Sequence, residues 1–200
     1  MSKNFFEIKK GNFIASKKNK VNNVNLVIEN QGQIISLLGP SGIGKTTILR
    51  TIAGLQKLSS GEVLLKGKTL SSDKTHIEPE KRNIALSFQD NSLFPNYKVI
   101  DNINFGKKRA NGSGSIIDVN EIIKLLHIEP ILEKFPHQIS AGEAQRVSLA
   151  RSLMSKPDLL LLDEPFSNID QSLKDEIQVS VKKLLKRINL TTIIVTHDSY

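Results

Sequence analysis

Residues 39–47 read Gly39-Pro40-Ser41-Gly42-Ile43-Gly44-Lys45-Thr46-Thr47, and the rest of the sequence is organised around them. The pattern G-x-x-x-x-G-K-T is typical of a loop that binds the phosphates of a nucleotide. Its glycines let the backbone turn tightly, so that several N–H groups point at one anion. Lys45 supplies positive charge for the β- and γ-phosphates, and the Thr46 hydroxyl suits Mg²⁺, which prefers oxygen ligands. We therefore assign all nine residues to a nucleotide site.

The flanks of this loop support the interpretation. Residues 34–38 form a short, mostly apolar run that is typical of a buried parallel strand. Residues 46–53 predict a helix, and Gly54 is placed to end it. A strand, a glycine-rich loop and a helix in this order place a bound phosphate at the positive end of a helix dipole. A purely structural glycine-rich turn is the alternative, but it does not explain why Lys45 and Thr46 stand at the positions that the motif requires.

Composition limits the class of protein. The chain has 200 residues, 38% of them hydrophobic and 24% charged, which predicts one globular domain with room for an inserted subdomain. It has no cysteine, which excludes disulfides and thiolate metal sites. Residues 1–10 lack the apolar core of a signal peptide, and no run is long enough to span a bilayer. We expect a cytosolic protein that reaches a membrane through a partner.

The net charge of +8 raises the question of a polyanionic partner. The lysines are spread along the chain, with one modest cluster at Lys17, Lys18 and Lys20. We interpret them as solvated surface and expect no nucleic-acid partner.

Three strands are predicted in the N-terminal part, at residues 5–8, 24–28 and 61–65. Phe13 falls in the turn region between the first two. An aromatic ring there can stack on a nucleotide base or pack in the core, and both alternatives stay open.

The composition changes after a predicted strand at residues 83–88, which is followed by Gln89. Residues 93–97 form an aromatic loop, and residues 111–115 form a flexible linker. Residues 90–157 therefore predict a small helical insertion within an α/β chain.

Two capping boxes mark helix starts within this insertion. Asp118 is predicted to cap a helix, with Glu121 completing the box. Ser140-Ala141-Gly142-Glu143 opens a second helix, which Pro157 bounds. Such an N-terminus can bind an anion, although taken alone it indicates a plain capped helix.

Four leucines at residues 159–162 predict a buried strand, and Asp163 and Glu164 follow at its carboxyl end. Ligands of open α/β sheets bind at that edge. Because adjacent residues of a strand face opposite ways, we expect the two carboxylates to do different jobs. Asp163 is suited to hold Mg²⁺, directly or through water, and Glu164 to face the attacking water.

The C-terminal part predicts one helix and one strand. Asp170 is placed to cap an amphipathic helix that runs to about Ile188. A last strand at residues 192–196 ends at His197, again at the carboxyl edge and near the expected γ-phosphate. The spacing of His76, His127 and His137 does not suggest a metal site.

These motifs together resemble the ATP-binding subunit of an ABC (ATP-binding cassette) transporter, over nearly the whole chain. The matching motifs are the phosphate loop Gly39–Thr47, the Q-loop glutamine Gln89, the signature Ile139-Ser140-Ala141-Gly142-Glu143, the Walker B strand Leu159–Pro165, the D-loop Ser167-Asn168-Ile169-Asp170 and the switch histidine His197. The resemblance implies an α/β fold: a P-loop NTPase (RecA-like) core, an N-terminal antiparallel β subdomain and an inserted α-helical subdomain. In this single ABC ATPase domain, residues 1–89 and 158–200 form the core and residues 90–157 the helical signature subdomain.

The resemblance also implies a mechanism with ATP and Mg²⁺. Two cassettes pair head to tail, and each ATP lies between one phosphate loop and the partner's signature, Ser140 to Glu143, with Asp170 nearby. Lys45 and Mg²⁺ neutralise phosphate charge, with Thr46, Gln89 and Asp163 around the metal. Glu164 polarises water, His197 contacts the γ-phosphate, and Gln89 links this site to the helical insertion.

Residues 87–95, 102–106 and 135–138 look like importer cassettes for iron(III), thiamine, polyamines and similar ions. The implied partners are a second ABC subunit, transmembrane permease subunits and a substrate-binding protein, at the cytoplasmic face of the inner or plasma membrane. We expect Phe94 and Tyr97 to help form a groove for a cytoplasmic helix of the permease, with local packing as the alternative.

The sequence departs from the family pattern at two places. Ala141 replaces the first glycine of the signature, which would weaken the partner-site contact if a glycine conformation is needed there. The chain also ends three residues after His197, where family members usually continue, so we expect a short or truncated cassette.

Three other functions share some of these motifs. Soluble ABC ATPases of DNA repair insert long coiled coils, and those of translation carry two cassettes; neither feature is present. A P-loop nucleotide kinase does not need the signature helix. A non-hydrolysing regulatory subunit does not need Glu164 and His197.

Overall fold

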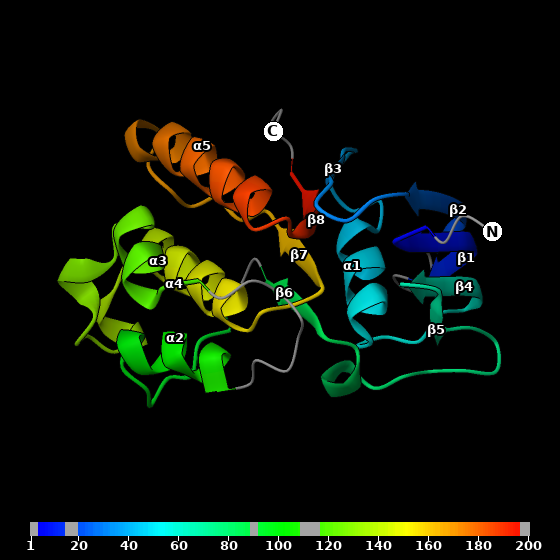
Figure 1. Cartoon of the computed structure of the whole chain (residues 1–200), viewed down its shortest axis with the longest axis horizontal. Coiled ribbons are helices and arrows are strands. Elements are labelled where there is room, and N and C mark those ends of the chain that lie inside the picture. Colours follow the sequence, from blue (N-terminus) through cyan, green and yellow to red (C-terminus); the bar gives the residue numbers. More distant parts are fainter. Residues whose placement is uncertain (1–3, 15–19, 89–91, 109–116, 197–200) are drawn as a thin grey trace.

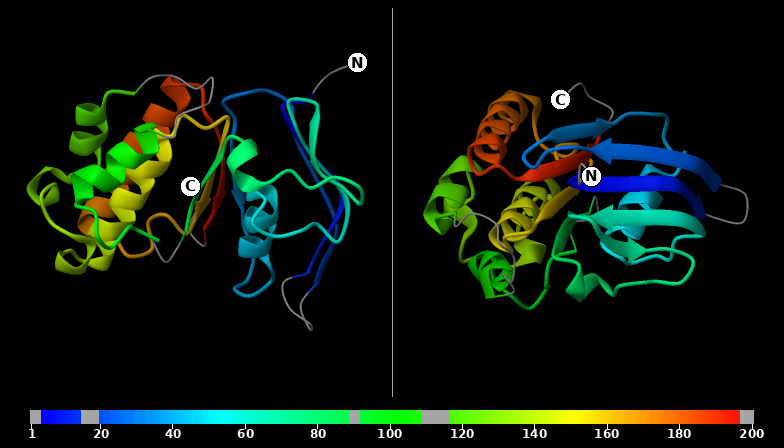
Figure 2. Two further views of the ribbon diagram at one scale, coloured as in Figure 1. Left: turned by 90° about the horizontal axis from the view of Figure 1, so that it is seen from below. Right: turned by 45° about the vertical axis from the view of Figure 1, so that its right-hand side comes forward.

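A computed structural model describes residues 4–14, 20–88, 92–108 and 117–196 of the chain (Figure 1). Within these residues there are two four-stranded sheets, one antiparallel and one parallel. Helix α1 (Lys45–Ala53) lies between the two sheets, and the longer helices cover the far face of the parallel sheet (Figure 2). Layers of this kind let each sheet bury at least one apolar face.

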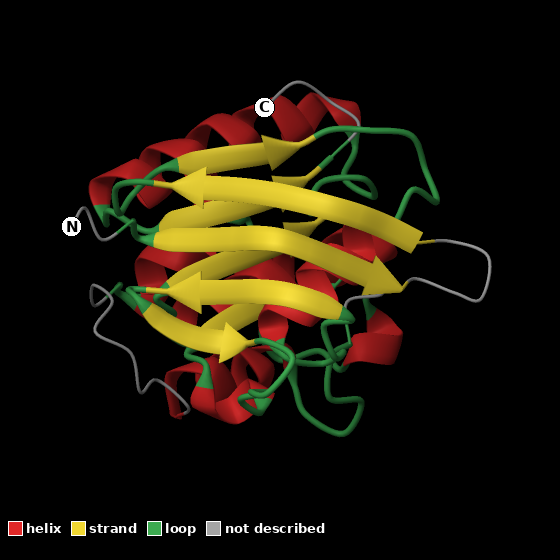
Figure 3. Ribbon diagram, turned by 90° about the vertical axis from the view of Figure 1, so that its right-hand side faces the viewer, coloured by secondary structure: helices red, strands yellow, loops and turns green. Residues whose placement is uncertain are grey.

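The antiparallel sheet has the strand order β2-β1-β4-β5 (Figure 3). It contains β1 (Phe6–Ile14), β2 (Lys20–Ile28), β4 (Ser60–Leu65) and β5 (Lys68–Ser71). The first two strands are longer than predicted, because a register shift at Gly11 lets the pairing continue through polar residues. Strand β5 was not predicted, since it is short and only its last two residues are buried.

The parallel sheet has the strand order β3-β8-β7-β6. It contains β3 (Ile34–Leu37), β6 (Ile84–Ser87), β7 (Leu159–Asp163) and β8 (Thr191–Val195). Every residue of β7 and β8 is buried, as expected for central strands covered on both faces. Leu159 and Leu161 pack in the cluster that includes α1, whereas Leu160 and Leu162 pack in the cluster of the longer helices.

The longer helices are α2 (Val99–Lys108), α4 (Ala141–Met154) and α5 (Gln171–Arg187), with a short α3 (Val119–Leu125). Three single turns of 3₁₀ helix complete the described elements, η1 (Pro79–Lys81), η2 (Glu129–Ile131) and η3 (Pro136–Gln138). Helix α5 buries one apolar stripe, which confirms the predicted amphipathic helix. Helix α1 ends at Gly54, whose φ of 87° is the left-handed conformation predicted for its stop.

The capping box predicted at Asp118 is half correct. The Asp118 carboxylate accepts a hydrogen bond from the backbone N–H of Asn120 (2.9 Å), so it does cap α3. The Glu121 carboxylate instead accepts from the Arg187 guanidinium of α5. A charged guanidinium is a stronger donor than a backbone amide, and the sequence does not show that it is near.

The segment assigned to a helical insertion shares its core with the rest of the chain. Ile103 of α2 and Leu149 of α4 belong to the same buried cluster as Leu160 of β7 and Ile177 of α5. The division at residues 90 and 157 therefore stays a prediction, and the predicted linker at residues 111–115 lies outside the described residues.

Arg82 ties three parts of the fold together. Its side chain is buried, and its guanidinium donates to the carbonyls of Thr51 (3.0 Å) and Ile52 (2.9 Å) in the last turn of α1. It also donates to the Ile77 carbonyl (2.6 Å) and to the Ser71 hydroxyl (2.8 Å) of β5. Burial lowers the pKa of Arg82 to about 10, so the group is still charged at neutral pH.

Replacing Arg82 with methionine should lower the free energy of unfolding by about 3 kcal/mol, because buried carbonyl groups lose their donor. Urea denaturation followed by circular dichroism measures this change. The control is Lys81→Met at the exposed neighbouring position, which should stay within about 0.5 kcal/mol of the parent protein. Equal stability of the two variants would contradict the role given to Arg82.

Candidate functional site

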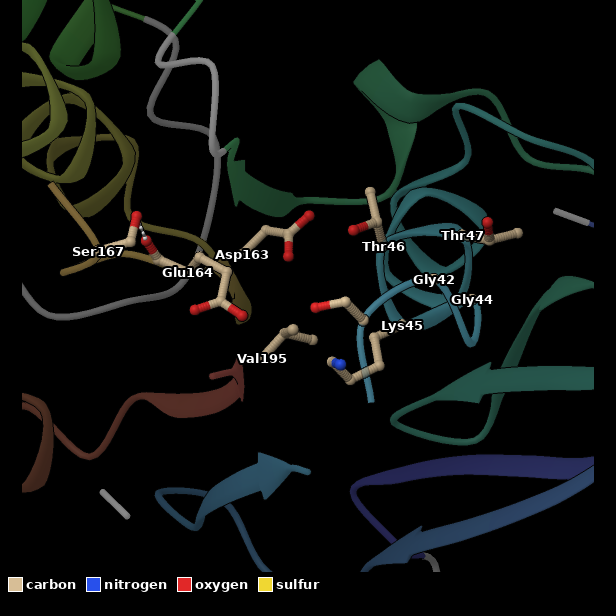
Figure 4. Close-up of a pocket in the computed structure, with 10 residues that line it drawn as sticks. Gly42, Gly44, Lys45, Thr46, Thr47, Asp163, Glu164, Ser167 and Val195 are labelled. Carbon is tan, nitrogen blue, oxygen red and sulfur yellow. Dashed lines mark hydrogen bonds between the residues drawn. The ribbon is translucent and has the colours of Figure 1, made fainter. Parts of the chain in front are cut away.

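A cavity of about 420 Å³ lies where the carboxyl edge of the parallel sheet meets the N-terminus of α1 (Figure 4). Side chains and backbone of the phosphate loop line one side of it, and residues after β7 and at the end of β8 line the other. The lining residues are Ser41, Gly42, Gly44, Lys45, Thr46, Thr47, Asp163, Glu164, Ser167 and Val195. The cavity therefore brings together two sequence motifs that are more than a hundred residues apart.

The phosphate loop takes the conformation that its glycines predict. Gly42 has a φ of 79° and Gly44 a φ of 106°, both in the left-handed region that favours glycine. Gly44 is the N-cap of α1, so the free N–H groups of the first turn open onto the cavity. An anion in the cavity would meet these N–H groups and the positive end of the helix dipole.

Lys45 is 8% exposed, and its ammonium group donates to the carbonyls of Gly39 (2.5 Å) and Pro40 (2.9 Å). These bonds hold the lysine across the base of the loop, with its charge on the cavity side. In the described part of the chain, Gly39 and Pro40 contribute to the site through these carbonyls rather than by lining it. Ile43 is 54% exposed and does not line the cavity.

Asp163 is the last residue of β7 and is 4% exposed. By alternation it continues the face of Leu159 and Leu161, which is the face that packs on α1. This places its carboxylate opposite the Thr46 hydroxyl across the cavity, where Figure 4 shows both oxygen-bearing groups.

The prediction that Asp163 and Glu164 face opposite ways is wrong. Strand β7 ends at Asp163, and Glu164 has a φ of 50°, so the alternation of the strand does not reach it. Both carboxylates line the same cavity (Figure 4). The left-handed backbone at Glu164 is costly for a residue with a Cβ and persists only where its surroundings fix it.

The signature residues lie outside this cavity. Ser140 caps α4 and Glu143 completes the predicted box, with Ser140 N–H donating to the Glu143 carboxylate (2.7 Å) and Glu143 N–H to the Ser140 hydroxyl (3.2 Å). Ser140 and Ala141 are exposed, and Gly142 is half-buried. Ala141 is a helical residue without positive φ, so no glycine conformation is needed at that position here.

The structure corrects one predicted ligand residue and one predicted helix cap. Phe13 lies within β1, not in a turn, and its ring is 0% exposed in the core cluster, so the core alternative holds and the ring is not available to stack on a base. Asp170 stands at the N-cap of α5, but within the described residues its carboxylate makes no capping bond, so the predicted cap is wrong. Asp170 does not line its own chain's cavity, and its expected place beside the partner's nucleotide stays a prediction. Gln89 and His197 lie outside the described residues.

Two residues of the site were not predicted as ligands. Ser167 lies in the stretch that we matched to the D-loop, and Val195 ends β8. The carboxyl edge of the sheet is the signal that could have identified both, because residues that end or follow parallel strands gather there. Gln145 of α4 also contacts the site, through the backbone of Glu164 (2.8 Å).

Among the residues that the structure describes, no three or more histidine or acidic side chains are grouped so that they could bind a metal ion. None of the helices in this described part combines the length and the apolar character that crossing a bilayer requires.

The loop, the helix N-terminus and the carboxylates define a nucleotide-binding protein of the phosphate-loop class. The model of the family described as "ABC transporter" matches residues 21–167, and the chain belongs to this family. Its fold is that of an ABC cassette, with an antiparallel β subdomain beside a parallel sheet covered by helices.

Three known proteins show the extent of the similarity. The Fe(3+) ions import ATP-binding protein FbpC of Escherichia coli O157:H7 is 40% identical over 198 residues, which cover 98% of this chain and 56% of FbpC. The spermidine/putrescine import ATP-binding protein PotA of Nitrosospira multiformis is 45% identical over 179 residues, 88% of this chain and 48% of PotA. The chain spans about half the length of these curated relatives.

The third is a solved structure, the dimeric ATP-binding cassette MJ0796 in a post-hydrolysis state bound to ADP and Pi. It matches with a TM-score of 0.79 at 28% identity, covering 96% of this chain and 88% of that one.

The capping box predicts a pH dependence of stability. Hydrogen bonds from Ser140, first from its backbone N–H, hold the pKa of Glu143 below the ordinary 4.5. Its carboxylate therefore contributes stability above pH 4.5, and this contribution is lost as the pH falls through the folded-state pKa. Glu143→Gln, which keeps an acceptor but removes the charge, should lower the free energy of unfolding at pH 7 by about 0.5 kcal/mol.

Urea denaturation of both proteins from neutral to acid pH measures this difference. The difference should be fully present above about pH 4.5 and shrink as the pH falls from there through the folded-state pKa of Glu143. A difference that grows toward acid pH would contradict the assigned sign. Glu143→Ala, which removes the acceptor as well, should cost about 1 kcal/mol at pH 7.

Proposed function

We propose that this chain is the ATP-binding and ATP-hydrolysing subunit of an ABC transporter, and that the transporter is an importer. One observation carries the proposal. Lys45 and Thr46 of the phosphate loop share a cavity of about 420 Å³ with Asp163 and Glu164, so phosphate-binding and water-activating groups face each other.

The loop side of the cavity would bind the triphosphate. Backbone N–H groups at the start of α1 and the Lys45 ammonium would carry the β- and γ-phosphates. The Thr46 hydroxyl and the Asp163 carboxylate are hard oxygen donors on opposite walls, which fits Mg²⁺ held partly by phosphate oxygens. Mg²⁺ bound between these two groups would neutralise part of the phosphate charge.

The opposite wall would activate water. Glu164 would accept a hydrogen bond from the attacking water and hold it in line with the γ-phosphate. His197 would contact the γ-phosphate, and Gln89 would connect the site to the helices that follow it. These last two roles are proposed from the motifs of the family.

The signature helix would serve a second copy of the chain. Ser140 and Ala141 are exposed and lie outside their own chain's cavity, so the N-terminus of α4 is available to another molecule. A head-to-tail pair would place it, with Asp170 close by, on the nucleotide of the partner. The similar cassette MJ0796 is dimeric, which supports the pairing of two copies.

The relatives support import of a small solute and do not single out one. FbpC is named for iron(III) and PotA for spermidine and putrescine, at similar identity to this chain. We propose iron(III) or another small inorganic or organic ion, delivered by a substrate-binding protein and carried by permease subunits. The chain would then lie at the cytoplasmic face of the membrane.

An aromatic cluster is the candidate contact with the permease. The Phe94 ring lies 4.5 Å from that of Phe105 and 5.5 Å from that of Tyr97, centroid to centroid. Phe94 is 36% and Tyr97 45% exposed, so the cluster presents apolar surface. Asn102 holds it in place, accepting from Phe94 N–H (2.9 Å) and donating to the Tyr97 carbonyl (3.1 Å).

Glu164→Gln should bind ATP normally and hydrolyse it at least about 100-fold more slowly, because the amide cannot take a proton from water. Phosphate release and binding of a fluorescent ATP analogue measure the two properties. The variant should also accumulate as an ATP-bound dimer in size-exclusion chromatography. A monomeric variant with unchanged turnover, or transfer of phosphate to a nucleoside monophosphate, would contradict the proposed function.

Phe94→Ala should reduce the membrane-bound fraction of the chain about tenfold in cells that co-express the permease, because it removes an aromatic anchor that the permease would cover. ATP turnover of the purified chain should change less than twofold. Val27→Ala removes another exposed apolar side chain, on β2, and serves as the control. Equal membrane association of both variants would favour local packing as the role of Phe94.

A further inference from the structure

Gln145 lies in the second turn of α4 and is 1% exposed. Its side-chain amide donates to the Glu164 carbonyl (2.8 Å) and to the Ser167 hydroxyl (3.2 Å). Its carbonyl oxygen accepts from the backbone N–H of Asn168 (3.1 Å). One buried side chain therefore bonds to three points of the turn that follows β7.

This turn determines where the Glu164 carboxylate lies. The Glu164 N–H donates to the Val195 carbonyl of β8 (2.9 Å), and the Glu164 carbonyl accepts from Gln145 and from the Ser167 hydroxyl (3.1 Å). Because both the N–H and the carbonyl of Glu164 are held by hydrogen bonds, the direction of its Cα–Cβ bond is fixed. The left-handed φ of 50° at Glu164 is then imposed by its neighbours.

A second contact joins α4 to the same turn. A Cβ added at Gly142 would lie 2.5 Å from the Asn168 carbonyl oxygen, which is closer than atoms pack, so the helix and the turn touch through backbone alone. Gly142 and Gln145 are three residues apart and therefore lie on one face of α4. The first turns of α4 and residues 164–168 are thus joined by one close approach and three hydrogen bonds.

We propose that Gln145 is a positioning residue for ATP hydrolysis. By bonding to the Glu164 carbonyl, it fixes the position of the Glu164 carboxylate and links that position to the N-terminus of α4. The inference rests on the proposed function, in which Glu164 serves the chain's own nucleotide and the start of α4 serves the partner's. Gln145 then connects the two nucleotide sites of the dimer within one chain. Movement of α4 on the partner's nucleotide would shift Glu164 relative to the water it polarises.

The test is Gln145→Met in the full chain, a change that keeps the size of the side chain and removes all three hydrogen bonds. We expect kcat for ATP to fall about 10- to 100-fold, since a small misplacement of a catalytic group has effects of that size. KM and the affinity for a fluorescent ATP analogue should change less than about threefold, because the phosphate loop is untouched. Unchanged kcat would overturn the inference.

A double-variant comparison separates positioning from general damage to the fold. If Gln145 acts through Glu164, Gln145→Met should add less than twofold to the loss of turnover already caused by Glu164→Gln. Independent, multiplying losses would overturn the inference. If Glu164→Gln alone keeps full turnover, the proposed function fails instead, so the two failures are distinguishable.

Two further variants keep the test decisive. Ser152→Ala removes a buried hydroxyl of the same helix that donates to the Ser148 carbonyl (3.0 Å), and it should leave kcat unchanged. Ser167→Ala removes the other side-chain donor to the Glu164 carbonyl, and Ser167 is exposed. This variant therefore tests the hydrogen bonding of the Glu164 carbonyl if Gln145→Met does not fold. It should lower kcat severalfold without further loss in the Glu164→Gln background, and unchanged kcat would overturn the inference.

Discussion

Burial of β7 on both faces is the constraint on which the rest of the structure depends. Leu159 and Leu161 pack toward α1, and Leu160 and Leu162 pack toward the longer helices. Each fully buried leucine contributes about 2 kcal/mol, so the strand cannot slip or turn over without losing several of these contributions. Because the strand is fixed in this way, Asp163 at its end must face the N-terminus of α1.

The site combines this rigid sheet with backbone conformations that are costly by themselves. Gly42 and Gly44 adopt left-handed φ values without penalty, whereas Glu164 adopts one against its preference. Glu164 donates a hydrogen bond to β8 and accepts one from α4, and these tertiary contacts offset the cost of its conformation. The carboxylate that we assign to water activation thus depends on two elements outside its own strand and loop.

The sequence predicted the local parts of the fold well. The glycine-rich loop, the helix that ends at Gly54 and the Ser140 capping box all follow from residues within a few positions of each other. Where a distant group competes, prediction failed: Glu121 pairs with Arg187 of another helix, and Glu164 leaves the strand pattern after β7. Phe13 could not be decided, since burial of a ring depends on what the other sheet and α1 place around it.

The amino-acid sequence alone determined the chemistry available to this protein: a phosphate loop, a carboxylate pair after an apolar strand, and a capped signature helix. These are short patterns whose meaning comes from propensity and spacing. The tertiary structure alone decided that both carboxylates share one cavity, that the signature residues lie outside it, and that Gln145 joins the two. These spatial relations depend on which surfaces pack together, and no single stretch of the chain specifies the packing between distant segments.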